Sequence, residues 1–125
     1  MTKGFTQQYC IDYSEPYAPV VKLGSLRSLL AIAASNNYEI HQGDITTAYL
    51  QGQLDEEIYM EVPEGVMASD LKPGIGKLAC RLLSGLYGLK QSGRIWNKAW
   101  DENLVGKCHF HRSAVDHAVY YRIGH

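Results

Sequence analysis

Asp44 is the residue with the clearest potential for chemistry, because a short alternating pattern leads up to it. Tyr38, Ile40, Gln42 and Asp44 would point to one side of a strand, and the residues between them to the other. The sequence therefore predicts a strand that places a carboxylate at its end, with the bulky Tyr49 five residues further on. Such a carboxylate could bind a metal ion, but most aspartates at strand ends only cap turns.

Charged residues are distributed unevenly around this stretch. Residues 39–70 contain eight Asp or Glu and no Lys or Arg, whereas residues 72–112 contain eight Lys or Arg and only two acidic residues. The local charges are therefore −8 and +6, in a chain whose net charge is −1. This pattern is compatible with metal ions beside a phosphate backbone, and equally with two solvated faces of opposite sign.

Length and cysteine content restrict the class of protein. A chain of 125 residues makes one domain or less. Its three cysteines are an odd number without C-x-x-C spacing, which predicts reduced thiols in an intracellular protein that is not secreted. The polar start MTKGFTQQYC predicts no signal peptide, and no apolar run is long enough to span a membrane. The cluster CHFH at 108–111 fits no zinc-finger spacing, so we predict no metal site there.

Two helices are predicted from apolar spacing. The first begins at a capping Ser25 and ends near Ser35, with a core-facing stripe of Leu23, Leu26, Leu29, Leu30 and Ala33. The second runs from about residue 94 to 105 and buries a stripe of Trp96, Ala99, Trp100 and Leu104.

Three further strands are predicted from alternation. In residues 58–62, Ile58 and Met60 would share one face, and Tyr59 and Glu61 the other. A loop over 66–76 would lead to a strand at 77–82, and the last strand would lie at 118–122. Together these elements predict an α+β fold with a mixed or antiparallel sheet and helices packed on one face.

Four blocks of the sequence resemble one known family, in that family's order. GDITTAYLQGQLDEEIYMEVPEG is similar to the first catalytic motif of the reverse transcriptases of copia-type LTR retrotransposons. The flanking blocks are KGFTQQYCIDYSEPYAPVVKLGSLRSLLAIAA, CRLLSGLYGLKQSGRIWNKAWD and RSAVDHAVYYR. The resemblance implies part of the fingers and palm of a right-hand polymerase, with residues 1–37 fingers-like and residues 38–125 palm-like.

The resemblance also implies roles for residues of the first motif. The family polymerises DNA with two divalent ions, Mg²⁺ or Mn²⁺, held by carboxylates from two places in the palm. Asp44 matches the first of these ligands, and Ile45 would add its backbone carbonyl. Tyr49 matches the bulky residue that excludes a ribose 2′-hydroxyl.

Residues of the third block match positions near the substrates. Gln91 matches a residue that lies against the incoming nucleotide, and Lys90 and Arg94 would contact nucleic acid. The partners implied are an RNA or DNA template–primer, deoxynucleotides and other parts of a retrotransposon polyprotein.

One motif of the family has no counterpart in these residues. The second carboxylate pair comes from a Tyr-x-Asp-Asp hairpin, which would follow the last residue of this chain, and no such run occurs in the sequence. We therefore expect a truncated fragment of an RNA-directed DNA polymerase that is inactive alone. The alternative is a non-catalytic remnant or interaction module that binds nucleic acid or an intact polymerase.

Overall fold

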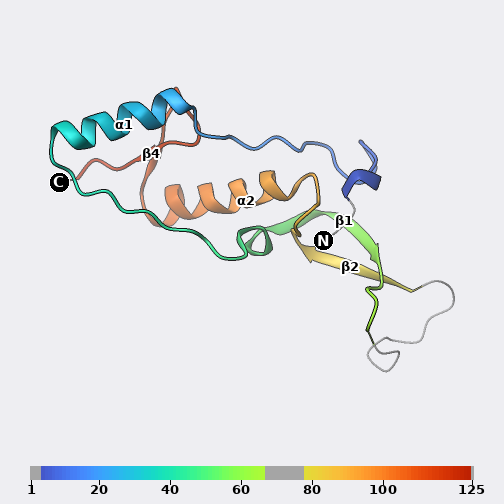
Figure 1. Cartoon of the computed structure of the whole chain (residues 1–125). Helices are drawn as coiled ribbons and strands as arrows, with labels where there is room; N and C mark the ends of the chain where they lie inside the picture. Colours follow the sequence, from blue (N-terminus) through green and yellow to red (C-terminus); the bar gives the residue numbers. More distant parts are fainter. Residues whose placement is uncertain (1–3, 67–77, 125) are drawn as a thin grey trace.

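A computed structural model describes residues 4–66 and 78–124 (Figure 1). In chain order their elements are η1 (Gly4–Thr6), α1 (Leu23–Ser35), η2 (Ala48–Gln51), β1 (Gln53–Glu61), β2 (Ala79–Ser84), α2 (Ser92–Asp101), the π-helical η4 (Glu102–Lys107), β3 (His111–Arg112) and β4 (Tyr120–Tyr121). Strand β1 pairs antiparallel with β2, and β3 pairs antiparallel with β4. The predicted α+β class is confirmed, with antiparallel pairing throughout these strands.

The hairpin of β1 and β2 follows the predicted alternation. Ile58 is buried and Met60 half-buried, whereas Tyr59 and Glu61 are exposed, so the two predicted faces are confirmed. Ile58 lies opposite Leu82 in the ladder. Strand β1 begins at Gln53, before the predicted start, and the register shifts between Gln53 and Ile58. The predicted loop 66–76 lies outside the described residues apart from Val66, as does residue 77.

The strand predicted at 38–44 is wrong. Residues 38–45 have no regular secondary structure and are all exposed. They form the connection from α1 to η2, which is drawn in teal to green in Figure 1. A strand requires a neighbour for its backbone N–H and C=O groups, and among the described residues none pairs with this connection. Asp44 therefore lies in an exposed connection and not at the end of a central strand.

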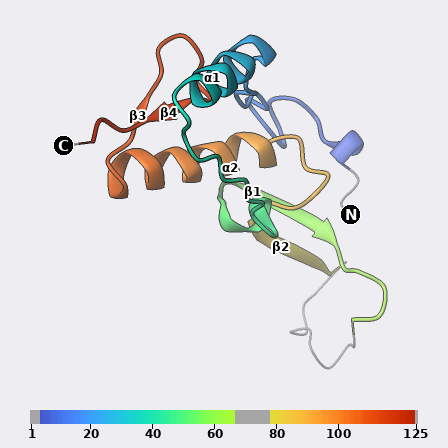
Figure 2. The same ribbon diagram turned by 60° about the vertical axis from the view of Figure 1, so that its left-hand side comes forward.

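Helix α1 is confirmed as a helix, but its predicted core-facing stripe is wrong. None of its residues is buried, and Leu23 and Leu26 are 59% and 41% exposed. It begins at Leu23, and its N-cap residue, Lys22, forms no side-chain capping bond. In both ribbon views α2 lies between α1 and the β1–β2 hairpin (Figure 2). The prediction that helices pack on the sheet therefore describes α2 and not α1.

The buried apolar residues of the described chain come from β1, from the turn before α2 and from α2 itself. They are Ile58, Leu89 and Ile95. Ile95 packs closely on Gly52, because a Cβ atom added at Gly52 would lie 2.5 Å from Cγ2 of Ile95. The predicted buried stripe of α2 is centred on the wrong residues. Ile95 is buried, whereas Trp96 and Trp100 are only half-buried, with their ring centroids 5.6 Å apart.

The small core corresponds to a large surface. The chain exposes 10082 Å², about half as much again as the roughly 6,700 Å² expected for a compact monomer of this mass. No helix in residues 4–66 and 78–124 is both long and apolar enough to cross a membrane.

Candidate functional site

Asp44 and Ile45 lie side by side in the connection that precedes η2. The Asp44 side chain is exposed, and none of the hydrogen bonds and ion pairs among the described residues involves its carboxylate. Ile45 is 39% exposed. The backbone then turns sharply at Thr47, whose φ of 55° lies in the left-handed region. This turn separates Asp44 from the packed part of the chain.

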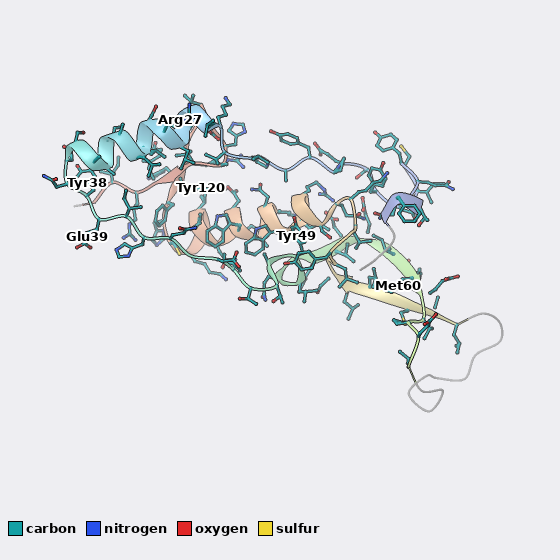
Figure 3. All side chains as sticks on the ribbon, in the orientation of Figure 1. Arg27, Tyr38, Glu39, Tyr49, Met60 and Tyr120 are labelled. Carbon is teal, nitrogen blue, oxygen red and sulfur yellow. The ribbon has the colours of Figure 1, made fainter. Side chains whose placement is uncertain are left out.

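Tyr49 is held more firmly, because η2 packs against the turn between β2 and α2. The Tyr49 side chain is labelled in Figure 3. Its ring contacts the ring of Tyr87, with centroids 4.8 Å apart and planes tilted by 56°. The backbone N–H of Gly85 donates a hydrogen bond of 3.0 Å to the carbonyl of Gly52. A Cβ at Gly85 would lie 2.7 Å from the Tyr49 carbonyl oxygen, so glycine permits this close approach.

Gln91 is completely buried at the start of α2. Its side-chain amide donates to the backbone carbonyl of Asp12 at 2.8 Å and to Oε2 of Glu56 at 3.0 Å. Its Oε1 accepts a hydrogen bond of 3.0 Å from the amide of Gln7. The structure therefore places Gln91 among protein groups from the N-terminal segment and β1.

Lys90 also contacts the N-terminal segment. Its ammonium donates to the Tyr13 hydroxyl at 3.1 Å and lies 4.8 Å from the centre of that ring. Its backbone N–H donates to Oε1 of Gln7 at 2.9 Å. The cation is thus engaged within the chain by a hydrogen bond and a cation–π contact.

Arg94 forms a two-pronged ion pair with Asp55 of β1. Its two terminal nitrogens donate to the two carboxylate oxygens at 3.0 and 3.2 Å. The guanidinium hydrogen bonds hold the pKa of Asp55 below its ordinary value, against a smaller opposing effect of burial. The Nε of Arg94 is buried without a partner.

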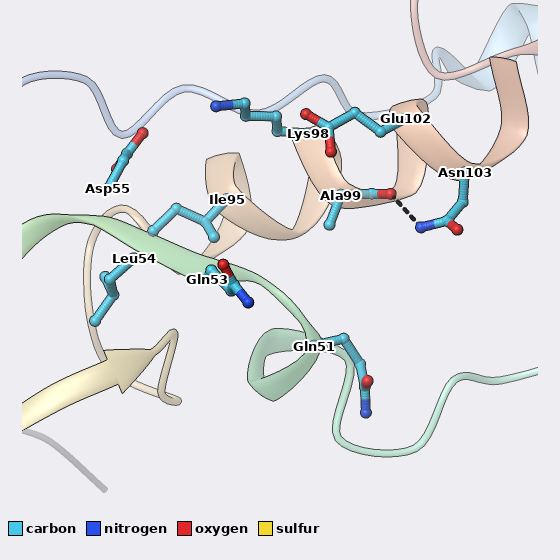
Figure 4. A pocket seen from close by; sticks show the side chains of 9 residues that line it. All are labelled: Gln51, Gln53, Leu54, Asp55, Ile95, Lys98, Ala99, Glu102 and Asn103. Carbon is cyan, nitrogen blue, oxygen red and sulfur yellow. Dashed lines mark hydrogen bonds between the residues drawn. The ribbon is translucent and has the colours of Figure 1, made fainter. Parts of the chain in front are cut away.

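Two cavities lie elsewhere on the molecule. One, of about 400 Å³, opens between β1 and the end of α2, where the Asn103 amide donates to the Ala99 carbonyl at 2.7 Å (Figure 4). The other, of about 270 Å³, lies between the segment before α1 and residues 114–117. None of the six predicted site residues lines either cavity.

Comparison with known proteins places the chain in a family. A family model described as Reverse transcriptase (RNA-dependent DNA polymerase) matches residues 1–125. The chain belongs to this reverse transcriptase family. The predicted resemblance to copia-type elements is confirmed, because the curated relatives are retrotransposon Pol polyproteins. No solved structure matches the chain.

Three relatives show how much of a Pol polyprotein this reverse transcriptase segment covers. The Retrovirus-related Pol polyprotein from transposon TNT 1-94 of Nicotiana tabacum is 40% identical over 122 residues, which are 98% of this chain and 9% of the relative. That from transposon RE2 of Arabidopsis thaliana is 38% identical over 77% of the chain and 6% of the relative. The Transposon Ty1-BL Gag-Pol polyprotein of Saccharomyces cerevisiae is 37% identical over 67% and 4%. The chain spans less than a tenth of the length of each.

The divalent ions implied by the reverse transcriptase family find no complete set of ligands here. In residues 4–66 and 78–124, no three His, Cys, Asp or Glu are grouped so that they could hold a metal ion. Asp44 alone offers one carboxylate, whereas a two-ion site needs several. The described residues therefore do not by themselves fit the metal site of the family.

Asp116 is a residue of structural importance that the sequence patterns missed. It is only 4% exposed, and its carboxylate accepts hydrogen bonds from the backbone N–H groups of Lys22 at 2.9 Å and Ala118 at 3.1 Å. The Ser25 hydroxyl, followed by the Lys22 N–H, holds the pKa of Asp116 below its ordinary value. Asp116 thus supplies the N-terminal cap that α1 lacks in its own sequence. The signal available was that the first turn of α1 contains no acidic residue.

Proposed function

We propose that this chain contributes part of the RNA-directed DNA polymerase of a retrotransposon Pol polyprotein, and that its 125 residues do not polymerise DNA alone. The match of the family model over the whole chain carries the first half of the proposal. The second half is supported by the single exposed carboxylate at Asp44 and by the lack of a grouped set of ligands among the described residues. In this assignment residues 1–37 are fingers-like and residues 38–125 palm-like.

Asp44, Ile45 and Tyr49 are the residues that we assign to the polymerase centre. The assignment rests on their match to the first catalytic motif, within GDITTAYLQGQLDEEIYMEVPEG. Asp44 would supply one carboxylate and Ile45 a backbone carbonyl, while the remaining ligands would come from outside these residues. Tyr49 suits a sugar-discriminating role physically, because its ring is braced by Tyr87 and its backbone by Gly85.

Lys90 and Arg94 remain assigned to contacts with the phosphates of a template–primer. Both cations already have partners within the chain, so phosphate would have to compete with Tyr13 and Asp55. The alternative is a non-catalytic remnant or interaction module that binds nucleic acid or an intact polymerase. The match of the family model over the whole chain is what favours the polymerase assignment.

Primer extension tests both halves of the proposal. The 125-residue chain, supplied with Mg²⁺ or Mn²⁺, an RNA template, a DNA primer and deoxynucleotides, is expected to incorporate no nucleotide. A chimaera is then made of the TNT 1-94 polyprotein, in which this chain replaces the corresponding segment. The chimaera is expected to extend the primer, and Asp44→Asn is expected to abolish this extension.

Glu39→Gln is the matched control, because Glu39 is an exposed carboxylate in the same connection as Asp44. It is expected to leave extension by the chimaeric polyprotein unchanged. Equal activity of the Asp44→Asn and Glu39→Gln chimaeras would refute the role of Asp44. Sustained, Asp44-dependent extension by the isolated chain would refute the claim that it is inactive alone.

A further inference from the structure

Residues 7–14, named the N-terminal strap here, are attached to β1 and to the turn before α2. We propose that Gln91 is a positioning residue that locks the N-terminal strap in place, and that its side chain contacts no nucleotide while the strap is bound. The proposal concerns contacts within this chain, and it stands or falls independently of polymerase activity.

The hydrogen-bonding capacity of Gln91 is the first observation. A glutamine amide has two N–H donors and one carbonyl acceptor. Both donors have partners, the Asp12 carbonyl and the Glu56 carboxylate, and the carbonyl oxygen accepts from Gln7. Because Gln91 is also 0% exposed, it has neither a free donor nor an open face for a ligand.

The partners of Gln91 are themselves tied to the strap. The second carboxylate oxygen of Glu56 accepts hydrogen bonds from the backbone N–H of Ser14 at 3.1 Å and from its hydroxyl at 3.0 Å. Glu56 therefore links Gln91 to the far end of the strap. At the near end, Oε1 of Gln7 accepts the backbone N–H of Lys90 at 2.9 Å.

Residues just before Gln91 extend this attachment. The Lys90 ammonium bonds the Tyr13 hydroxyl. Just before the strap, Gly4 is buried against the carbonyl of Gly88, so closely that no side chain fits there. The strap is thus bound at both ends and in its middle by residues that lie 42 to 84 positions away along the chain.

The energetics explain why Gln91 would control the strap. A buried polar group that loses its partner carries an uncompensated cost of desolvation, and Gln91 has three partners in one buried place. Strap and side chain must therefore be released together. Contact between Gln91 and a nucleotide, as the family match implies, would first require that release.

Amide hydrogen exchange of the full chain tests the lock. Gln91→Met keeps the length of the side chain and removes its hydrogen bonds, so the protected amides of Cys10, Asp12 and Ser14 are expected to exchange about tenfold faster or more. Gln8→Met is the matched control, because Gln8 takes part in the described contacts through its backbone only. It is expected to leave these rates unchanged.

A charge swap separates hydrogen bonding from packing. Gln91→Glu would place a second carboxylate against Glu56. The other charged groups of this attachment are the Asp12 carboxylate, which accepts the Gln8 N–H, and the Lys90 ammonium, which bonds the Tyr13 hydroxyl. Two carboxylates in this place repel each other unless one of them is protonated, so strap protection is expected in acid and is expected to be lost as the pH rises towards neutrality. The double variant Gln91→Glu/Glu56→Gln restores one donor and is expected to regain protection at neutral pH. A residue that acted by volume alone would show no such pH dependence or rescue.

Three results would overturn the proposal. They are unprotected strap amides in the unaltered chain, unchanged protection in Gln91→Met, and a Gln91→Glu variant whose strap protection is independent of pH. If Gln91→Met unfolds the chain, Gln7→Ala replaces it, since Gln7 is only half-buried and its loss removes two of the strap's bonds. Exchange that rose equally along the whole chain in Gln7→Ala would also refute a local lock.

Discussion

Gly85 brings two segments together so closely that the smallest side chain is expected to disturb the fold. In Gly85→Ala the new Cβ would lie 2.7 Å from the Tyr49 carbonyl oxygen and 3.2 Å from the Ser92 hydroxyl, whereas ordinary contact begins at 3.4 Å. The turn must therefore move by 3.4 − 2.7 = 0.7 Å away from η2. That movement would stretch the 3.0 Å hydrogen bond from Gly85 to Gly52 beyond bonding distance.

The cost follows from overpacking and from the weakened bond. Overpacking costs about 1–3 kcal/mol, and the lost hydrogen bond accounts for about 1 kcal/mol of it. With a urea dependence of about 2 kcal/mol per M, a loss of about 2 kcal/mol lowers the unfolding midpoint by about 1 M. Urea unfolding followed by the fluorescence of Trp96 and Trp100, which lie on the adjoining α2, measures this shift.

Gly93→Ala provides the control within the same packed unit. Its Cβ would meet only the Ala18 side chain, at an ordinary 3.5 Å, and it lies in α2, where alanine favours the helix. Its midpoint is expected to equal or exceed that of the unaltered chain. If Gly85→Ala unfolded at the same urea concentration as Gly93→Ala, the close packing of η2 against this turn would be refuted.

Three further predictions concern charged residues. Because Arg94 lowers the pKa of Asp55, their ion pair stabilises the fold at pH values above the ordinary carboxyl pKa of 3.8, and this stabilisation is lost as the pH falls through the lower pKa of the folded state. Asp55→Asn should therefore remove this part of the acid sensitivity in acid-unfolding curves. The expected size is about 1 kcal/mol or less, because the pair is partly exposed. Asp116→Leu should increase amide exchange of Leu26 in the first turn of α1, and unchanged protection there would contradict the capping role. The dissociation constant for an RNA–DNA hybrid, measured by fluorescence anisotropy, is expected in the non-specific range of about 10⁻⁴–10⁻⁶ M. The double variant Lys90→Ala/Arg94→Ala should reduce the slope of log K against log salt concentration by about 2. Salt-insensitive binding would refute a role of these residues in phosphate contact.

Strands were predictable from the sequence only where they have a partner. The strands predicted at 58–62 and 77–82 overlap β1 and β2, where Ile58, Cys80 and Leu82 are the more buried members of the alternating pattern. Tyr38 to Asp44 alternate just as well, yet they form no strand among the described residues. Conversely, Gln53 to Glu57 are poor strand formers and were missed, although they belong to β1. Pairing is a long-range property that a local pattern does not contain.

The helices and the site show the same limit. The spacing of leucines predicts α1 correctly, but it cannot say whether another surface covers them, and here they are exposed. Ser25 is predicted as the cap of α1, whereas its hydroxyl bonds Asp116, a residue far along the chain. Gln91 was recognised from its motif, but its burial depends on Gln7 and Glu56, which no motif indicated. The proposed catalytic role of Asp44 stays a prediction based on family resemblance.

The cap on α1 has a consequence for the order in which the chain acquires its structure during synthesis. The backbone N–H of Lys22 is satisfied by a carboxylate 94 residues later. At a translation rate of about 5–20 residues per second, roughly 5–20 s separate the synthesis of the helix start from that of its cap. Throughout this interval α1 lacks its capping carboxylate, and its leucine side chains would be accessible to chaperones at the ribosome. The attachment of α1 is therefore expected to be among the last steps of folding, and a ribosome stalled before Asp116 should present α1 uncapped.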